Sequence, residues 1–333
     1  MKIKITTLSP IHIGSGEEYD KNFNFIVDGD YIYLLDEFQV VEFFISQNMI
    51  VPENLNYLKT FIEKNKDKLI KNKIYKRKIK SYWQNMNTIL ENLSTQNKPI
   101  ISGSSIKGAI ETAIFSLLID DNERVENIKN HLENRNFDER RFNDRNRTKH
   151  TIDNDFKKIF TYLKISDSID ELQTQIYKTI NIKKDKSHQG NRGGKVEQIA
   201  NYVESIQPKQ EFIITIKDES DKEFENKIFE NDLAKICNGY YLPKLNKQLK
   251  YYFYKKGSIG LSQLNGRFLL NLGRFGGAES KTIDEYRYIR NSHDDDKNKT
   301  SAITFALEKN GTPPFFENEL VPFGWVIAEI QKA

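Results

Sequence analysis

Strand-like patterns stand near both ends of this chain and limit the folds that it can adopt. Polar and apolar residues alternate over 2–8, and an apolar stretch over 320–330 is also typical of a strand. Between them the patterns run as strands, helices and strands, twice over. Consecutive βα pairs are too few for a doubly wound parallel sheet. The sequence therefore predicts an α+β fold.

Local patterns predict the individual elements. Asp28-Gly29 between two apolar runs predicts a β-hairpin over 23–35. Apolar residues at helical spacing predict a buried helix that begins near Ser104. The remaining predictions are helices over 37–48, 53–93 and 226–255, and a strand over 210–217.

The predicted elements fall into two groups. We divide the chain near residues 200–210 into one module over 1–205 and a second module over 206–333. The first module carries helical insertions and a loop over 133–151, which is crowded with charges of both signs. The second module contains a series of glycines. We find no internal sequence repeat.

Composition excludes several classes of protein. The 333 residues carry a formal net charge of +4, a mildly basic balance that does not imply a nucleic-acid partner by itself. Cys237 is the only cysteine, which excludes an intrachain disulfide and a cysteine-based zinc site. No apolar run is long enough to span a membrane, and the start lacks a signal-peptide core. We expect a cytoplasmic protein without a metal or cofactor.

Gly103 and Gly108 are spaced like the glycines of a nucleotide-phosphate loop. That loop needs Lys and then Ser or Thr after the second glycine, but Ala109 and Ile110 follow Gly108, so a nucleotide site is excluded. Ser104 or Ser105 can cap the helix that starts here, and its free N–H groups with Lys107 suit a phosphodiester. The alternative is a capped core helix whose lysine is only solvated.

Three stretches occur together in a fixed order, and a fourth closes the chain. They cover 9–16 (SPIHIGSG), 102–109 (SGSSIKGA), 272–282 (LGRFGGAESKT) and the tail 321–326 (VPFGWV). This combination resembles the RAMP superfamily of CRISPR-associated proteins. Within it, the length and the order of motifs are most similar to the fifth subunit type of the type III-A Csm effector complex.

The resemblance implies a fold and a function. The fold would be two ferredoxin-like (RRM-like) modules with helical insertions and glycine-rich loops. The function would be a non-catalytic RNA-binding subunit that caps the backbone filament at the 3′ end of the guide RNA (crRNA) and supports guide maturation and antiviral defence. Its implied partners are the guide RNA, the neighbouring backbone RAMP subunit, the small subunit and recruited host nucleases.

The resemblance and the residue types together give the candidate RNA-binding residues. Glycines allow a close backbone approach, and lysine or arginine neutralises phosphates. The candidates are His12, Gly103, Ser104, Ser105, Lys107, Gly108, Arg192, Lys195, Gly273, Arg274, Gly276, Gly277 and Lys281. Glu111 stands where the family has arginine, so Glu111→Arg should strengthen binding if this helix tip faces a phosphate. The aromatic signature of RRM domains is absent, so base stacking on a sheet is not expected.

Two other functions remain open at this point. His12 could act as the general base of a metal-independent endoribonuclease that processes guide RNA. Alternatively, the chain could be mainly a protein-docking cap.

Three further stretches have weaker predictions. The basic run 71–80 is predicted to be a solvated helix face, and Asp294–Asp296 a solvated loop rather than a metal cluster. Tyr251–Tyr254 with their flanking lysines could stack on RNA.

Overall fold

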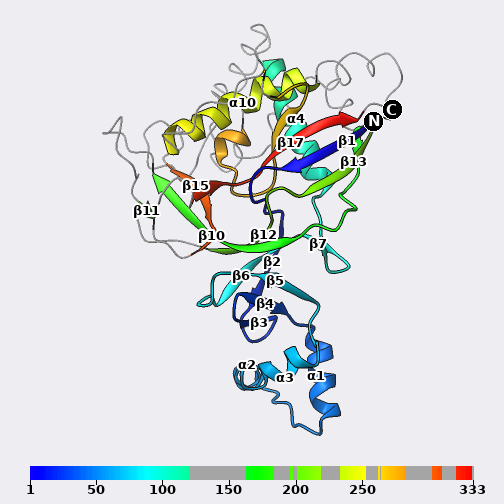
Figure 1. Cartoon of the computed structure of the whole chain (residues 1–333), viewed down its shortest axis with the longest axis vertical. Helices are drawn as coiled ribbons and strands as arrows, with labels where there is room; N and C mark the ends of the chain where they lie inside the picture. Colours follow the sequence, from blue (N-terminus) through cyan, green and yellow to red (C-terminus); the bar gives the residue numbers. More distant parts are fainter. Residues whose placement is uncertain are drawn as a thin grey trace, which may run out of the picture.

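The computed structural model describes nine stretches of the chain, and the account below concerns them alone. These are residues 1–119, 163–183, 196–197, 201–218, 233–252, 262, 264–282, 302–309 and 320–331. They form a five-stranded sheet, a ten-stranded sheet and a two-stranded hairpin, with helices at both ends of the molecule (Figure 1). The fold is therefore of the mixed α+β kind that the sequence predicts.

The first sheet joins the two ends of the chain. Its order is β14-β17-β1-β13-β9, and all its neighbouring strands are antiparallel. The strands are β1 (Lys2–Thr7), β9 (Leu163–Ile165), β13 (Glu211–Asp218), β14 (Phe268–Asn271) and β17 (Trp325–Gln331). Since β1 pairs with β17, the N-terminus and C-terminus lie side by side (Figure 1).

Two long helices cover the first sheet. They are α4 (Gly103–Ile119) and α10 (Leu233–Tyr252). Apolar residues of both helices share one core with the sheet, from Ile3 to Ala328. The Tyr241 hydroxyl of α10 donates to the Ala109 carbonyl of α4 at 2.9 Å, which holds the two helices together. The predicted helix near Ser104 is confirmed, as is the helix over 226–255 within its described part.

The second sheet lies between the first sheet and a group of short helices. Its main path is β2-β6-β12-β10-β5-β4-β3, and β15 pairs with both β10 and β16. The strands are β2 (Gly14–Asp20), β3 (Phe25–Asp28), β4 (Tyr31–Leu34), β5 (Arg77–Lys80), β6 (Thr88–Asn92), β10 (Thr174–Lys183), β11 (Val196–Glu197), β12 (Tyr202–Ile206), β15 (Ala302–Leu307) and β16 (Leu320–Pro322). The separate hairpin is β7 (Ser94–Thr95) with β8 (Lys98–Pro99). The hairpin predicted around Gly29 is confirmed as β3 and β4.

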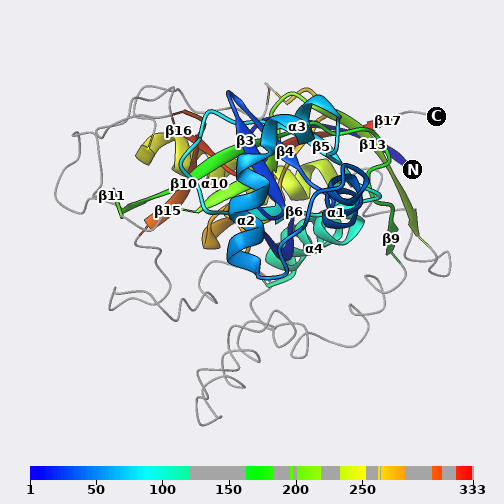
Figure 2. The same ribbon diagram turned by 90° about the horizontal axis from the view of Figure 1, so that it is seen from below.

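Three short helices form the far end of the molecule. They are α1 (Glu37–Ser46), α2 (Leu55–Lys64) and α3 (Lys66–Lys71), and they lie in front of the second sheet when it is seen from below (Figure 2). Asp36 and Asn54 cap α1 and α2 by accepting hydrogen bonds from backbone N–H groups. Phe44 and Leu69 pack with Ile26 and Tyr33 of the hairpin.

The predicted helix over 53–93 is wrong beyond residue 71. Lys73 adopts a left-handed φ of 58°, which ends the helical path, and the chain then enters β5 and β6. The basic run 71–80 is therefore a helix end, a turn and a strand rather than one helix face. Lysine favours helices locally, but pairing of β5 with β4 buries Ile79 and decides the structure.

The predicted boundary at residues 205 and 206 does not separate the sheets. β1 of the first predicted module pairs with β13 and β17 of the second. In the other sheet, β10 pairs with β15. Both sheets therefore contain strands from both predicted modules, because segments inserted between the elements of the first sheet build the second.

Candidate nucleic-acid interface

Three of the four motif stretches meet where the two sheets join. We call residues 9–13, 271–277 and 323–325 the junction. The Arg274 backbone N–H donates to the His12 carbonyl at 2.8 Å, and the Gly324 N–H donates to the Pro10 carbonyl at 2.8 Å. The Leu272 N–H donates to the Gly324 carbonyl at 2.7 Å. The first two of these hydrogen bonds join residues 262 and 314 positions apart in sequence, and the third joins the two late stretches.

The glycines of the 272–282 loop are required by this close packing. Gly273 has a φ of +70°, and a Cβ atom there would collide with the His12 carbonyl oxygen. A Cβ atom on Gly276 would collide with the Asn271 side chain, which donates to the Phe323 carbonyl at 3.0 Å. The sequence predicts that another backbone comes close to these glycines. At Gly273 the backbone that comes close is the protein's own, at His12.

Arg274 is the exposed cation of the junction. Its guanidinium carbon lies 5.1 Å from the centre of the Phe275 ring. Phe275 in turn lies 5.5 Å from the His12 ring and 5.4 Å from the Phe323 ring. The tilted, packed rings therefore lie beneath a guanidinium that is exposed to solvent, where it is available to a phosphate.

Lys281 and Lys107 each bind a backbone carbonyl of the protein. The Lys281 Nζ donates to the Asn271 carbonyl, and the Lys107 Nζ donates to the Leu163 carbonyl at 2.9 Å. Both lysines therefore tie a glycine-containing segment to a strand. A lysine has three donors, so each remains a source of positive charge near its loop.

Side chains of the protein itself accept hydrogen bonds from backbone N–H groups at the start of α4. Ser102, rather than Ser104 or Ser105, accepts the capping hydrogen bond, from the Ser105 N–H at 3.3 Å. The Gly103 N–H donates to the Asp167 carboxylate at 2.7 Å, so that an internal anion lies at the positive end of the helix. This corrects the prediction of N–H groups that point freely outward at the helix start.

Gly103, Gly108 and Glu111 of α4 are also set by the protein's own packing. Gly103 has no room for a Cβ atom, which would collide with the Ile165 carbonyl oxygen. The Gly108 carbonyl accepts from the Thr112 hydroxyl at 2.6 Å. Glu111 is 8% exposed, so Glu111→Arg would place a bulky charge in the interior and does not test a phosphate contact.

His12 is fully buried at the junction. Its Nδ1 lies 2.7 Å from the Glu204 carbonyl oxygen, so Nδ1 carries the proton, and Nε2 has no partner among the described residues. Burial lowers the pKa of His12 to about 4, the bond to Glu204 opposes this shift, and the Arg274 charge adds to it. RNA contact or proton transfer from bound RNA needs a reachable nitrogen. In this structure His12 is instead a buried side chain that hydrogen-bonds to the Glu204 backbone.

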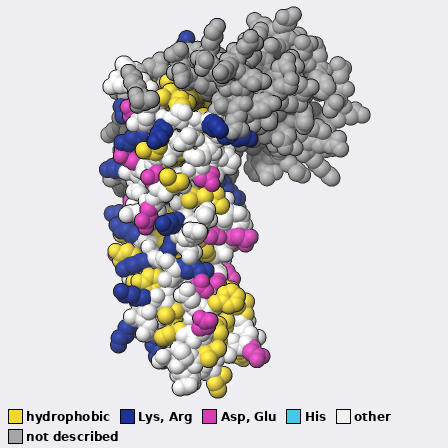
Figure 3. Space-filling view, turned by 90° about the vertical axis from the view of Figure 1, so that its right-hand side faces the viewer, with side chains coloured by type: hydrophobic (Ala, Val, Ile, Leu, Met, Phe, Trp, Pro, Cys, Tyr) yellow, Lys and Arg dark blue, Asp and Glu magenta, His cyan; other side chains and the backbone are white. Residues whose placement is uncertain are grey.

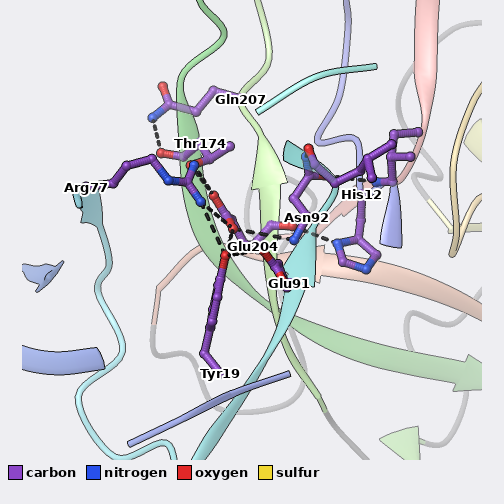
Figure 4. A network of polar contacts seen from close by, with 10 residues as sticks. His12, Tyr19, Arg77, Glu91, Asn92, Thr174, Glu204 and Gln207 are labelled. Carbon is purple, nitrogen blue, oxygen red and sulfur yellow. Dashed lines mark hydrogen bonds and ion pairs between the residues drawn. The ribbon is translucent and has the colours of Figure 1, made fainter. Parts of the chain in front are cut away.

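An ion pair inside the second sheet lies next to His12 (Figure 4). The Glu204 side chain is fully buried, and its carboxylate accepts from both terminal nitrogens of Arg77, at 2.8 Å and 3.1 Å. The Thr174 hydroxyl donates to the same carboxylate at 2.7 Å, and the Asn92 N–H donates at 3.4 Å. The buried charge is thus paired and hydrogen-bonded, as its burial requires.

The network extends from this pair to both sides. The Tyr19 hydroxyl donates to the Glu91 carboxylate at 2.8 Å and lies 3.5 Å from Glu204 (Figure 4). Burial and the neighbouring Glu204 charge raise the pKa of the Tyr19 hydroxyl. The Asn92 amide oxygen accepts from the Ile13 N–H at 2.9 Å. The segment between β1 and β2 that carries His12 is therefore bound to the network at two places, His12 and Ile13.

Sequence reasoning missed Glu204 and Arg77. Glu204 lies within a short strand that is otherwise apolar on its buried side, which is the signal that could have identified it. Arg77 is the one arginine in a run of lysines, and its planar fork is suited to a bidentate carboxylate contact.

Other candidates lie outside the described residues. They are Arg192, Lys195, Asp294–Asp296, Phe253 and Tyr254, whereas the Tyr251 and Tyr252 backbones form the end of α10. Within the described stretches, no group of three or more His, Cys, Asp or Glu could hold a metal ion. In the same stretches, no helix is both long and apolar enough to cross a membrane.

Comparison with known proteins assigns the family. The family model described as the RAMP superfamily matches residues 4–247, which is more than half of the chain. The chain belongs to the RAMP superfamily. This match covers the His12 stretch, the start of α4 and the Glu204 strand, and it confirms the resemblance seen in the sequence.

Individual relatives are consistent with this family. Over 189 residues the chain is 32% identical to the CRISPR system protein Csm5 of Methanocaldococcus jannaschii; the match covers 51% of this chain and 43% of that protein. A chain in the cryo-EM structure of a Csm–crRNA–target RNA ternary complex from a type III-A CRISPR-Cas system matches with a TM-score of 0.65 and 17% identity, over 99% of this chain and all of that one. The crystal structure of T. onnurineus Csm5 matches with a TM-score of 0.58 and 16% identity, over 97% and 99% of the two chains.

The pKa of His12 predicts a pH dependence of stability. The folded state holds His12 near a pKa of 4, whereas an unfolded histidine titrates near 6.5. The unfolded chain therefore binds the proton first, and the stability present above pH 6.5 is lost as the pH falls toward 4. The loss from this residue is about 3 kcal/mol. His12→Asn keeps a donor for Glu204 but does not titrate, so urea unfolding at pH 7 and pH 4.5 should differ less in this variant. Equal pH dependence in both proteins would contradict the assignment.

Substitutions at Arg77 and Glu204 should have strongly non-additive effects on the free energy of unfolding. Arg77→Met leaves a buried carboxylate without its cation and should lower the free energy of unfolding by about 3–5 kcal/mol. Adding Glu204→Gln removes the stranded charge, so the double variant should be more stable than Arg77→Met alone. Denaturant titration of Arg77→Met, Glu204→Gln and the double variant measures the free energies of unfolding. If the two single losses add up to the loss in the double variant, the pair does not act as a unit.

Gly273 and Gly239 form a matched pair for testing the junction. Gly273→Ala adds a side chain at a positive φ and against a backbone oxygen, so it should cost about 2 kcal/mol or more. Gly239 is exposed in α10 with nothing within 4 Å of a Cβ atom, so Gly239→Ala should stabilise the protein by about 1 kcal/mol. Thermal unfolding compares them, and a harmless Gly273→Ala would refute the close packing.

Proposed function

We propose that this chain is a non-catalytic RNA-binding subunit of a type III-A CRISPR Csm effector complex. In this role it caps the backbone filament at the 3′ end of the guide RNA. The observation that carries the proposal is the fold match over 99% of the chain to a chain of a Csm–crRNA–target RNA complex. The 32% identity to Csm5 over about half of the chain supports it.

We infer that the first sheet is a ferredoxin-like module. The succession β1, α4, β9, β13, α10 and β17 gives a βαββαβ order, and the strands lie as β17-β1-β13-β9. If these four strands are numbered one to four along the chain, their order in the sheet is 4-1-3-2, which is the ferredoxin-like order. β14 is added at the edge. The second sheet, with α1 to α3, takes the place of the second module that the resemblance implies.

The proposed RNA contact is at the junction. Arg274 is exposed there on a rigid base of aromatic rings, and the Lys281 charge lies on the same loop. Contacts of this kind neutralise phosphates and carry little sequence information, which suits a subunit that must accept any guide. The proposed partners are the guide RNA, the adjacent backbone RAMP subunit and the small subunit, while nuclease recruitment remains an expectation from sequence.

A noncatalytic role is supported by the setting of His12. It is the one histidine in a motif stretch, and it is buried and neutral at physiological pH. No other described group takes its place as a candidate base in the junction. Incubation of repeat RNA with the wild-type chain should therefore leave the RNA intact, and His12-dependent cleavage at one position would overturn the noncatalytic assignment.

Arg274→Ala tests the RNA contact directly. Loss of one phosphate contact should lower the affinity for single-stranded guide RNA and flatten the slope of log K against log salt by about 0.7. Lys235→Ala, an exposed lysine on α10, is the matched control and should change neither quantity. Fluorescence anisotropy of labelled RNA at several salt concentrations measures both. Identical slopes for the two variants would remove Arg274 from the interface.

A further inference from the structure

A row of lysines and tyrosines lies on the second sheet and the loops beside it. We call Tyr31, Lys78, Lys80, Tyr82 and Lys309 the Lys–Tyr strip. The Lys78 ammonium lies 3.7 Å from the centre of the Tyr31 ring, and the Lys80 ammonium lies 4.7 Å from that of Tyr82. Lys309 approaches the Tyr82 ring at 5.6 Å. Cations and ring faces therefore alternate along one surface.

Strand register explains why these side chains share a face. In the pairing of β4 with β5, Tyr31 is opposite Lys80, and Ile32 is opposite Ile79. Side chains alternate between the two faces of a sheet, so the isoleucines point into the core while Tyr31 and Lys80 point the other way. Tyr31 is 38% exposed, whereas Ile32 and Ile79 are buried. The pairing of β4 with β5 therefore fixes the positions of Tyr31, Lys78 and Lys80 in the strip.

Buried residues, Gln175 and Tyr177 among them, lie between the strip and the junction. Gln175 of β10 is opposite Lys80, and it donates to the Glu308 carboxylate at 3.0 Å. Two residues further along β10, Tyr177 lies on the same face and packs with Phe323 and, next to it, Phe275. Burial and the neighbouring Glu308 charge raise the pKa of the Tyr177 hydroxyl. Buried packing, and not an exposed surface, therefore connects this part of the second sheet to the ring beneath Arg274.

The charge of this region is mainly positive. Three lysines belong to the strip, and the nearby acid Glu308 is bound by Gln175. Asp28 lies 3.6 Å from Lys66, which partly neutralises it. The Tyr82 hydroxyl beside Lys80 raises the pKa of that ammonium, so that it stays charged. Figure 3 shows that Lys and Arg side chains gather in a column along one edge of the molecule.

We propose that the Lys–Tyr strip is a second RNA contact, which binds a single strand by stacking bases on Tyr31 and Tyr82 and by holding phosphates with Lys78, Lys80 and Lys309. The proposal rests on the RNA-binding function argued above and adds a contact on the second sheet to the one at Arg274. Ring faces that now accept a lysine ammonium can accept a base when the lysine moves to the phosphate. The RRM aromatic signature is absent from the sequence, yet the strip provides a stacking surface from other positions.

An acidic protein segment is the competing ligand for a lysine-rich surface. It would need the lysines but would gain little from flat tyrosine faces, whereas single-stranded RNA uses both groups. The regular placement of lysines over rings therefore favours RNA.

Two double variants separate stacking from charge. Tyr31→Leu with Tyr82→Leu should weaken binding of a fluorescent single-stranded RNA by about tenfold or more and leave the salt slope unchanged. Lys78→Gln with Lys80→Gln should flatten the slope by about 1.4, the value for two phosphates on a single strand. The matched controls are Tyr57→Leu on α2, where Tyr57 is 71% exposed, and Lys209→Gln with Lys235→Gln; both should bind as wild type.

The outcomes distinguish this inference from the proposed function. If Arg274→Ala weakens binding and both strip variants bind as wild type, the strip inference is overturned and the proposed function stands. If the wild-type chain binds no RNA at low salt, both are overturned. Loss of complex assembly in the lysine variant, with RNA binding unchanged in both strip variants, would identify an acidic protein ligand and also overturn the inference. Circular dichroism of each variant confirms that the fold is kept.

Discussion

The hydrogen bond from the Arg274 N–H to the His12 carbonyl is the contact on which the arrangement of the two sheets depends. It exists because Gly273 lacks a Cβ atom and adopts a positive φ. The same loop carries Phe275, whose ring packs between those of His12 and Phe323. Gly273, the buried His12 and the exposed Arg274 thus form one structural unit. The Arg274 guanidinium lies at the surface over Phe275, whose ring is held by packing against His12 and Phe323.

Buried and exposed charges have separate roles in this molecule. The Arg77–Glu204 pair lies inside the second sheet, where it is bonded on all sides and stabilises the strand that supports His12. Lys107, Lys281 and Asp167 saturate backbone groups near the glycine-containing loops. The exposed cations that remain in the described region include Arg274 and the lysines of the strip. A count of basic residues would not have made this distinction, because it depends on what each ammonium or guanidinium contacts.

Local patterns were enough to predict the hairpin at Gly29 and the helix that begins at Gly103, because both depend on neighbours in sequence. β5 and β6 both fall within the predicted helix over 53–93; the lysines of β5 favour a helix locally, and only pairing with other strands places both segments in a sheet. Local patterns also do not show which strands share a sheet, since β1 and β17 pair from opposite ends of the chain. The motif stretches near His12 and Gly273 were recognised, but the Asp167 cap and the burial of His12 arise from contacts 64 and 192 residues apart.

The contacts at the junction should join both sheets into one cooperative unit. The protein contains two tryptophans, with Trp325 buried in the core of the first sheet and Trp83 in that of the second. Trp83→Phe and Trp325→Phe therefore each leave a single fluorescent reporter for one sheet. For each variant, urea unfolding is followed by fluorescence and by far-UV circular dichroism. The account predicts that the two transitions coincide in both variants. Separate midpoints, with one sheet unfolding before the other, would contradict it.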